Sequence, residues 1–173
     1  MKRGMSDERE RLKRIRRLLG FFVFGLVVSG LTAFPLVTEV GLLKAWFGAG
    51  TAVGRAWPGL AGWIERVYVG LVETERAFPF ILYGTDWLAF AHLVIAVAFW
   101  GPYQDPVRNR WVIQFGMIAC VAVIPLALLA GAVRGIPLFW RAIDCSFGVF
   151  GIIPLWLADR EVVRWSAERG PPS

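Results

Sequence analysis

Four side chains that can hold charge or exchange protons lie inside otherwise apolar stretches of this 173-residue sequence. They are two carboxylates, one arginine and the only histidine of the chain: Asp86, His92, Arg141 and Asp144. An ionised side chain at the centre of a membrane helix costs about 2.5–3.5 kcal/mol on insertion scales. Such residues therefore need partners, and their chemistry is either ion pairing between helices or ligand binding coupled to proton movement.

The spacing around Arg141 favours the structural role. One face of the helix expected here carries five residues at i+3 and i+4 spacing: Arg141, Asp144, Gly148, Gly151 and Leu155. Glycines on that face allow a neighbouring helix to approach closely. A forked guanidinium can serve two carboxylates. We therefore expect a structural ion pair among Asp86, Arg141 and Asp144 that sets the register of two helices.

The alternative interpretation is a polar pocket that opens outward. In it Arg141 is the candidate ligand-binding residue, because it would hold an anionic or polar ligand group. The catalytic candidates are Asp86, His92 and Asp144, any of which could move a proton. None of them is assigned as catalytic, since a lone membrane histidine is more often a hydrogen-bonded packing residue.

Motifs for metal, nucleotide or hydrolase chemistry are missing from the sequence. Cys120 and Cys145 lie in apolar runs without a CxxC pattern, and a single histidine excludes bis-His haem within one chain. The patterns GxSxG, GxxxxGK[ST] and HExxH do not occur. We expect neither a metal site nor a cofactor.

Composition assigns the chain to the membrane proteins. Hydrophobic residues make up 57% of it and charged residues 18%, with a mean hydropathy of +0.56. Soluble domains carry about 25% charged residues. These values exclude an intrinsically disordered chain, a secreted disulfide scaffold and a typical cytosolic enzyme.

Four stretches are long enough to cross a bilayer, which takes about 20 apolar residues. The first uncharged run, Leu18–Val37, is longer than the roughly 7–15 residues of a signal-peptide core, so we expect a retained helix. The predicted spans cover about 18–40, 80–100, 111–133 and 136–158, and together they form a membrane domain over residues 18–158. The predicted fold class is all-α, a four-transmembrane-helix bundle.

The distribution of Lys and Arg predicts the orientation. Eight lie in the basic tail of residues 1–17, two in the 101–110 turn and three after residue 158, against four in the 38–79 segment and Arg134 outside. The positive-inside rule then places both termini in the cytoplasm, including a C-terminal tail over residues 159–173. Because a basic run before a span is typical of an anchor attracted to anionic lipid, nucleic acid is not an expected partner. We expect the chain to lie in a bacterial inner membrane.

The outer 38–79 segment contains a predicted amphipathic helix over about residues 58–76. Its apolar side carries Leu60, Trp63, Ile64, Val67, Tyr68, Leu71 and Val72, and its opposite side carries Glu65, Arg66, Glu73 and Arg76. We expect this helix to lie in the outer membrane–water interface, with a lid or docking surface over the bundle as the alternative.

These features favour a non-catalytic integral membrane protein. It would be an accessory or structural subunit of a larger membrane complex, or a self-associating bundle. The expected partners are the lipid bilayer and other integral membrane subunits or a second copy. The alternative is a small membrane enzyme or a lipid- or quinone-binding protein that uses Asp86, His92, Arg141 and Asp144.

Overall fold

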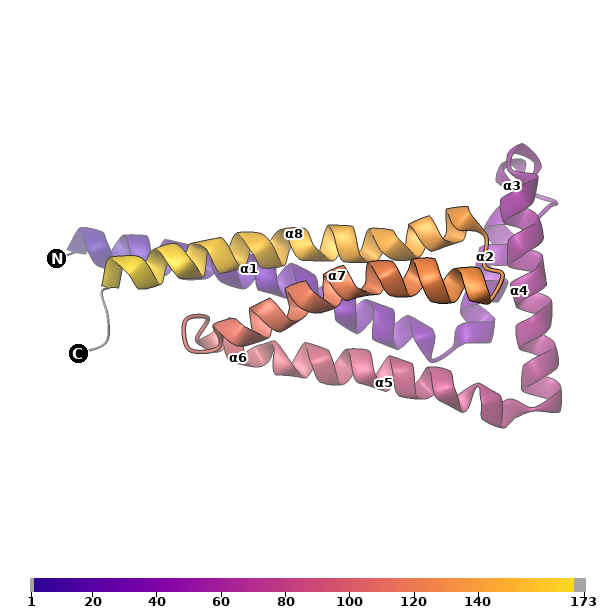
Figure 1. Cartoon of the computed structure of the whole chain (residues 1–173), viewed down its shortest axis with the longest axis horizontal. Coiled ribbons are helices and arrows are strands. Elements are labelled where there is room, and N and C mark those ends of the chain that lie inside the picture. Colours follow the sequence, from indigo (N-terminus) through magenta and orange to yellow (C-terminus); the bar gives the residue numbers. More distant parts are fainter. Residues whose placement is uncertain (1, 170–173) are drawn as a thin grey trace. The chain divides into compact units, whose positions relative to one another are not determined.

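The computed structural model describes residues 2–169 and the side chains of residues 7–168. Over that range all regular structure is helical, as the sequence predicts (Figure 1). The elements are α1 (Lys2–Ala33), α2 (Leu36–Phe47), α3 (Ala52–Ala56), α4 (Pro58–Ala77), η1 (Pro79–Ile81), α5 (Tyr83–Ala98), α6 (Trp100–Gln104), α7 (Arg110–Val133) and α8 (Leu138–Arg169). Four segments are long and apolar enough to cross a membrane: Asp7–Ala33, Pro79–Gln104, Arg110–Val133 and Leu138–Glu168. The prediction of four helices of this length and apolar character is confirmed.

The chain divides into two compact units. The first consists of Met1–Gly25 and Ala96–Ser173, and the second of Leu26–Ile95. The first unit therefore holds most of α1 together with α6, α7 and α8, and the second holds the end of α1, α2, α3, α4, η1 and most of α5.

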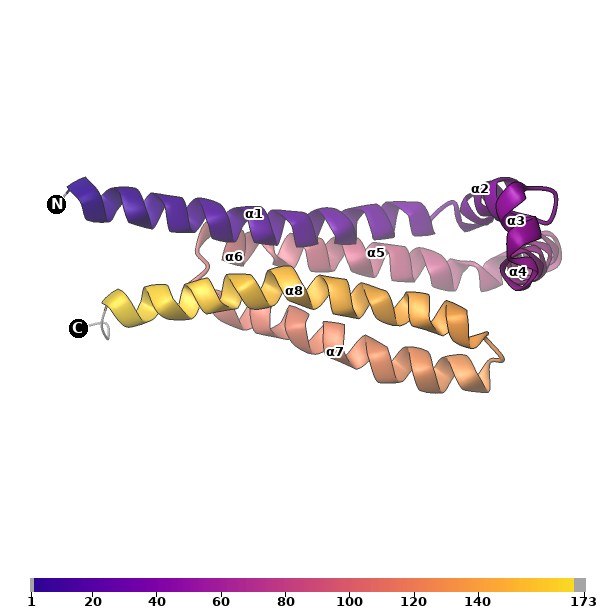
Figure 2. The same ribbon diagram turned by 90° about the horizontal axis from the view of Figure 1, so that it is seen from above.

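In the first unit α7 and α8 lie side by side along most of their length (Figures 1 and 2). The glycine face of α8 makes this contact possible. A Cβ at Gly148 would collide with the carbonyl oxygen of Cys120, and a Cβ at Gly151 would lie 3.0 Å from the Cys120 Sγ. The predicted close-approach face therefore packs against α7.

The largest fully buried side chains all belong to the first unit, and we call this set the terminal core. They come from the basic part and the first apolar turn of α1, from α6 and its flanking residues, from the start of α7 and from the second half of α8. The terminal core consists of Ile15, Leu19, Phe99, Pro102, Pro106, Ile113, Leu155 and Val162. Each of these helix segments therefore has at least one side chain that is completely covered by protein.

The first helix differs from the predicted boundaries at both ends. It already includes Lys2, so the basic 1–17 segment continues the spanning helix instead of forming a separate tail, with residue 1 outside the described residues. It ends at Ala33, well before the predicted end of the span at residue 40. Proline at position 35 lacks an N–H and disfavours helical backbone at Phe34, so the chain breaks here and restarts as α2.

The last helix also extends beyond its predicted end at residue 158. It runs on to Arg169, so the 159–173 tail is helical as far as the structure describes it, and residues 170–173 lie outside that range. The extension has its own buried side chains, Val162 and Trp165. Packing of these two residues explains why the helix does not stop where the apolar run stops.

In the second unit α4 runs crosswise to α5 and packs on α2 (Figures 1 and 2). The predicted two-sided pattern of α4 is confirmed. Its seven apolar stripe residues, from Leu60 to Val72, are buried or half-buried, whereas Glu65, Arg66, Glu73 and Arg76 are exposed. Lys44 on α2 contacts α4 at the boundary between these two sides. Its Nζ lies 2.9 Å from the Glu65 carboxylate on the charged side and 4.5 Å from the centre of the Tyr68 ring on the apolar side.

Candidate functional site

Two of the predicted site residues lie on α5. Asp86 is half-buried in the first turn of the helix. His92, two turns further along, has its Nδ1 at 2.8 Å from the carbonyl oxygen of Leu88. Because a carbonyl can only accept, that ring nitrogen carries a proton and donates it within the same helix. The geometry matches that of a packing histidine with one satisfied ring nitrogen.

The other two predicted site residues lie on α8. Arg141 extends across Gly131 of α7, where a Cβ would lie 2.5 Å from the arginine Cδ, and its Nη1 donates to the Leu128 carbonyl at 3.1 Å. Its Nε is buried and has no hydrogen-bond partner among the described residues. Asp144, one turn along, is half-buried. Arg141 therefore connects α8 to the backbone of α7.

The predicted ion pair among Asp86, Arg141 and Asp144 stays a prediction, since Asp86 belongs to the second unit and the other two to the first. No group of three or more His, Cys, Asp or Glu residues gathers within the described part of the chain. Cys120 and Cys145 are free thiols.

A set of ion pairs near the chain termini was not expected from the sequence. Arg110, the first residue of α7, donates two hydrogen bonds to the Asp159 carboxylate of α8. One runs from Nε to Oδ1 at 2.6 Å and the other from Nη2 to Oδ2 at 2.9 Å. Two further bridges join α1 to α8: Arg11 with Glu168 at 3.0 Å and Arg14 with Glu161 at 3.2 Å. These bridges tie α1 and α7 to the second half of α8.

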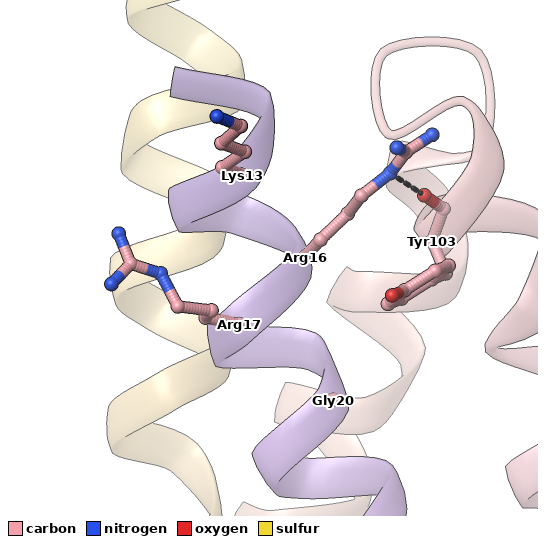
Figure 3. Close-up of a pocket in the computed structure, with 5 residues that line it drawn as sticks. All are labelled: Lys13, Arg16, Arg17, Gly20 and Tyr103. Carbon is pink, nitrogen blue, oxygen red and sulfur yellow. Dashed lines mark hydrogen bonds between the residues drawn. The ribbon is translucent and has the colours of Figure 1, made fainter. Parts of the chain in front are cut away.

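The remaining cations of the same stretch of α1 line an open recess (Figure 3). Its lining consists of Lys13, Arg16, Arg17, Gly20 and Tyr103, and its volume is about 680 Å³. Pockets that bind small molecules measure about 300–1,000 Å³. Among the described residues, no carboxylate pairs with the three cations of this basic recess.

Arg16 is held in a defined position within the basic recess. Its Nε donates to the Tyr103 carbonyl at 2.9 Å (Figure 3). Its Nη2 lies 3.5 Å from the Gln104 carbonyl oxygen. Its guanidinium also lies 5.4 Å from the centre of the Tyr103 ring, which stacks on Trp100 with ring centres 5.6 Å apart. The orientation of this charge is therefore set by α6, while Lys13 and Arg17 are exposed.

Helical periodicity separates Arg16 from the two ion-paired cations of α1. At about 3.6 residues per turn, Arg16 projects about 140–160° away from both Arg11 and Arg14. Lys13 lies between Arg16 and Arg17, whereas Arg17 lies only about 60° from Arg14. The sequence was interpreted here only as a charged tail, so this division was missed although the spacing contains it. The contribution of Tyr103 carries no such signal, because it lies 87 residues from Arg16.

Comparison of the chain with protein-family models, with curated proteins and with solved structures gives no match.

Proposed function

We propose that this chain is a non-catalytic integral membrane protein that serves as an accessory or structural subunit of a larger membrane complex or associates with itself. One observation carries this proposal: the terminal core combines fully buried side chains with three ion pairs between helices of the first unit. Rigid elements hold binding surfaces more accurately than mobile ones. A packed, charged helix end fits a docking platform.

The contacts of Arg141 support the non-catalytic role. Its hydrogen bond to the Leu128 carbonyl and its packing over Gly131 connect two helices. An intramembrane arginine used in this way stabilises helix association through its donors. We propose that Asp86 and Asp144 complete this structural ion pair.

The proposed location is a bacterial inner membrane with both termini in the cytoplasm. The Lys and Arg bias supports this orientation. The same bias assigns α4 to the outer side. We propose that α4 lies in the membrane–water interface there, since its charged side is exposed, its apolar side is buried or half-buried, and the helix packs on α2.

The orientation can be tested with reporter fusions. Green fluorescent protein fused after Ser173 should fluoresce and alkaline phosphatase at the same point should be inactive, because only the first reporter matures in the cytoplasm. Alkaline phosphatase fused after Gly50, between α2 and α3, should be active. The opposite pattern at both points would contradict the proposed orientation.

The subunit role can be tested by native mass spectrometry of the full chain, extracted from its own membrane in a mild detergent. We expect a second integral membrane chain, or a second copy, in a fixed ratio. The combined Asp86→Asn and Arg141→Gln variant should retain this partner and the cellular function if it folds. A chain that stays single is the result that contradicts the proposal.

One observation favours the second candidate function, a small membrane enzyme or a lipid- or quinone-binding protein. The buried Arg141 Nε has no partner among the described residues, and such a donor suits a polar ligand group. In that case the same preparation would contain a single chain with a quinone- or lipid-like molecule. The molecule and the cellular function would both be lost in the folded double variant.

A further inference from the structure

We infer that the basic recess binds the phosphate of an anionic phospholipid in the leaflet that faces the chain termini. The site consists of Arg16, held by α6, the exposed cation Lys13, the exposed cation Arg17, which points away from Arg16 in Figure 3, and the open position at Gly20. It goes beyond the proposed subunit role, because a lipid site of this kind does not depend on whether the chain has a protein partner.

The basic recess lies at the boundary between the charged part and the apolar part of α1. Arg17 is the last charged residue of α1, and the uncharged run begins at Leu18. Across the recess, Trp100 and Tyr103 form a stacked aromatic pair near the end of the second candidate span. Tyr and Trp concentrate at the headgroup level of bilayers. Both sides of the recess therefore place it among lipid headgroups.

The charges of the recess suit a phosphate. Arg11 and Arg14 have carboxylate partners on α8, whereas no carboxylate pairs with Lys13, Arg16 or Arg17 within the described part of the chain. Guanidinium groups bind phosphate oxygens through two parallel hydrogen bonds, and an ammonium adds a mobile point charge. Because Arg16 is oriented by two carbonyl oxygens in advance, less conformational entropy is lost when it binds.

The surface next to the charges suits an acyl chain. One stripe of α1 runs through Lys13, Arg17, Gly20 and Phe24 at i+4, i+3 and i+4 steps. No atom lies within 4 Å of the position where Gly20 would carry a Cβ, so this turn is open. Phe24, one turn further into the apolar run, is 66% exposed. Along this stripe the cations would lie beside the lipid headgroup, the open position at Gly20 beside the glycerol, and the Phe24 ring beside the acyl chain.

The site can be tested on the full-length chain in a neutral detergent. Phosphatidylglycerol and phosphatidylcholine with identical acyl chains are added in turn, and the retained lipid is counted by native mass spectrometry. We expect one phosphatidylglycerol to be retained with about tenfold higher affinity than phosphatidylcholine, which corresponds to about 1.4 kcal/mol. Equal retention of the two lipids would overturn the proposal.

Matched variants distinguish a built site from general attraction to basic residues. Arg16→Gln should abolish the preference for phosphatidylglycerol over phosphatidylcholine. Arg16→Lys should retain only part of this preference, because lysine keeps the positive charge but lacks the two parallel donors of a guanidinium group. Arg14→Gln removes the same charge from the opposite side of α1 and should retain the preference. Equal losses in Arg14→Gln and Arg16→Gln would show diffuse electrostatics and contradict a defined site.

Two further comparisons keep the test decisive if Arg16→Gln does not fold. Gly20→Leu fills the open position and should lower phosphatidylglycerol retention several-fold, whereas Gly25→Leu, which also meets no atom within 4 Å, should not. Glycerol 3-phosphate at millimolar concentration should leave the lipid bound. If it displaces the lipid completely, the site takes a soluble phosphate and the lipid proposal is wrong.

Failure here is distinguishable from failure of the subunit role. Lipid loss in Arg16→Gln concerns the basic recess alone, whereas ligand loss in the Asp86→Asn and Arg141→Gln variant concerns the predicted polar pocket. A chain with no retained lipid can still contain a stoichiometric protein partner.

Discussion

Gly148→Ala is expected to destabilise the protein by about 2–3 kcal/mol, because the added methyl group overpacks the contact between α7 and α8. The new Cβ would collide with the Cys120 carbonyl oxygen and would lie 2.7 Å from Val123 Cγ1. Since the nearer atom belongs to backbone, relief requires the two helices to separate. Reversible unfolding in mixed micelles with increasing dodecyl sulfate, followed by circular dichroism, measures the change.

The matched control is Gly25→Ala on α1, where no atom lies within 4 Å of the added group. Alanine is a better helix former than glycine by about 1 kcal/mol, so this variant should be neutral or slightly more stable. Gly116→Ala should fall between the two, since its closest contacts are the ends of Phe99 and Leu155 side chains at 2.7 and 2.8 Å. Equal stability of Gly148→Ala and Gly25→Ala would show that the contact between α7 and α8 has room for an added methyl group at Gly148.

Local sequence patterns predicted much of the fold. Hydropathy depends on neighbouring residues only, so the four spans were found, and helical periodicity identified the apolar and charged sides of α4 from Leu60 to Arg76. The same periodicity found the glycine face of α8. The end of the first span was missed because the apolar run continues through the break at Phe34 and Pro35.

The candidate site was less predictable because its contacts join distant parts of the chain. Arg110 and Asp159 are 49 residues apart, and Arg11 and Glu168 are 157 residues apart. Charge counting treated all of these as topology signals. The structure divides them into residues with an ion-pair partner on another helix and residues of the basic recess, for which the described part of the chain offers no carboxylate partner. Which partner each cation has depends on the docking of α1, α6 and α8, which no local pattern contains.

Breaking the bridge between Arg110 and Asp159 is expected to cost about 1–3 kcal/mol of unfolding free energy, between the values for exposed and buried pairs. The Asp159 side chain is 13% exposed and that of Arg110 is 40% exposed, and two parallel hydrogen bonds join them. Arg110→Gln leaves a nearly buried carboxylate without its cation, so it should be more harmful than Asp159→Asn, which leaves a partly hydrated guanidinium. The mixed-micelle unfolding experiment measures both.

A double-mutant cycle separates the pair energy from other effects of each substitution. The combined Arg110→Gln and Asp159→Asn variant should be more stable than the sum of the two single losses implies, because neither charge is then left unpaired. The same cycle on Lys44 and Glu65, which are 37% and 49% exposed and share one contact, should give a coupling of about 0–1 kcal/mol. If the Arg110–Asp159 coupling is no larger than this, the bridge does not hold the start of α7 against α8, and the terminal core alone must keep these helix ends together.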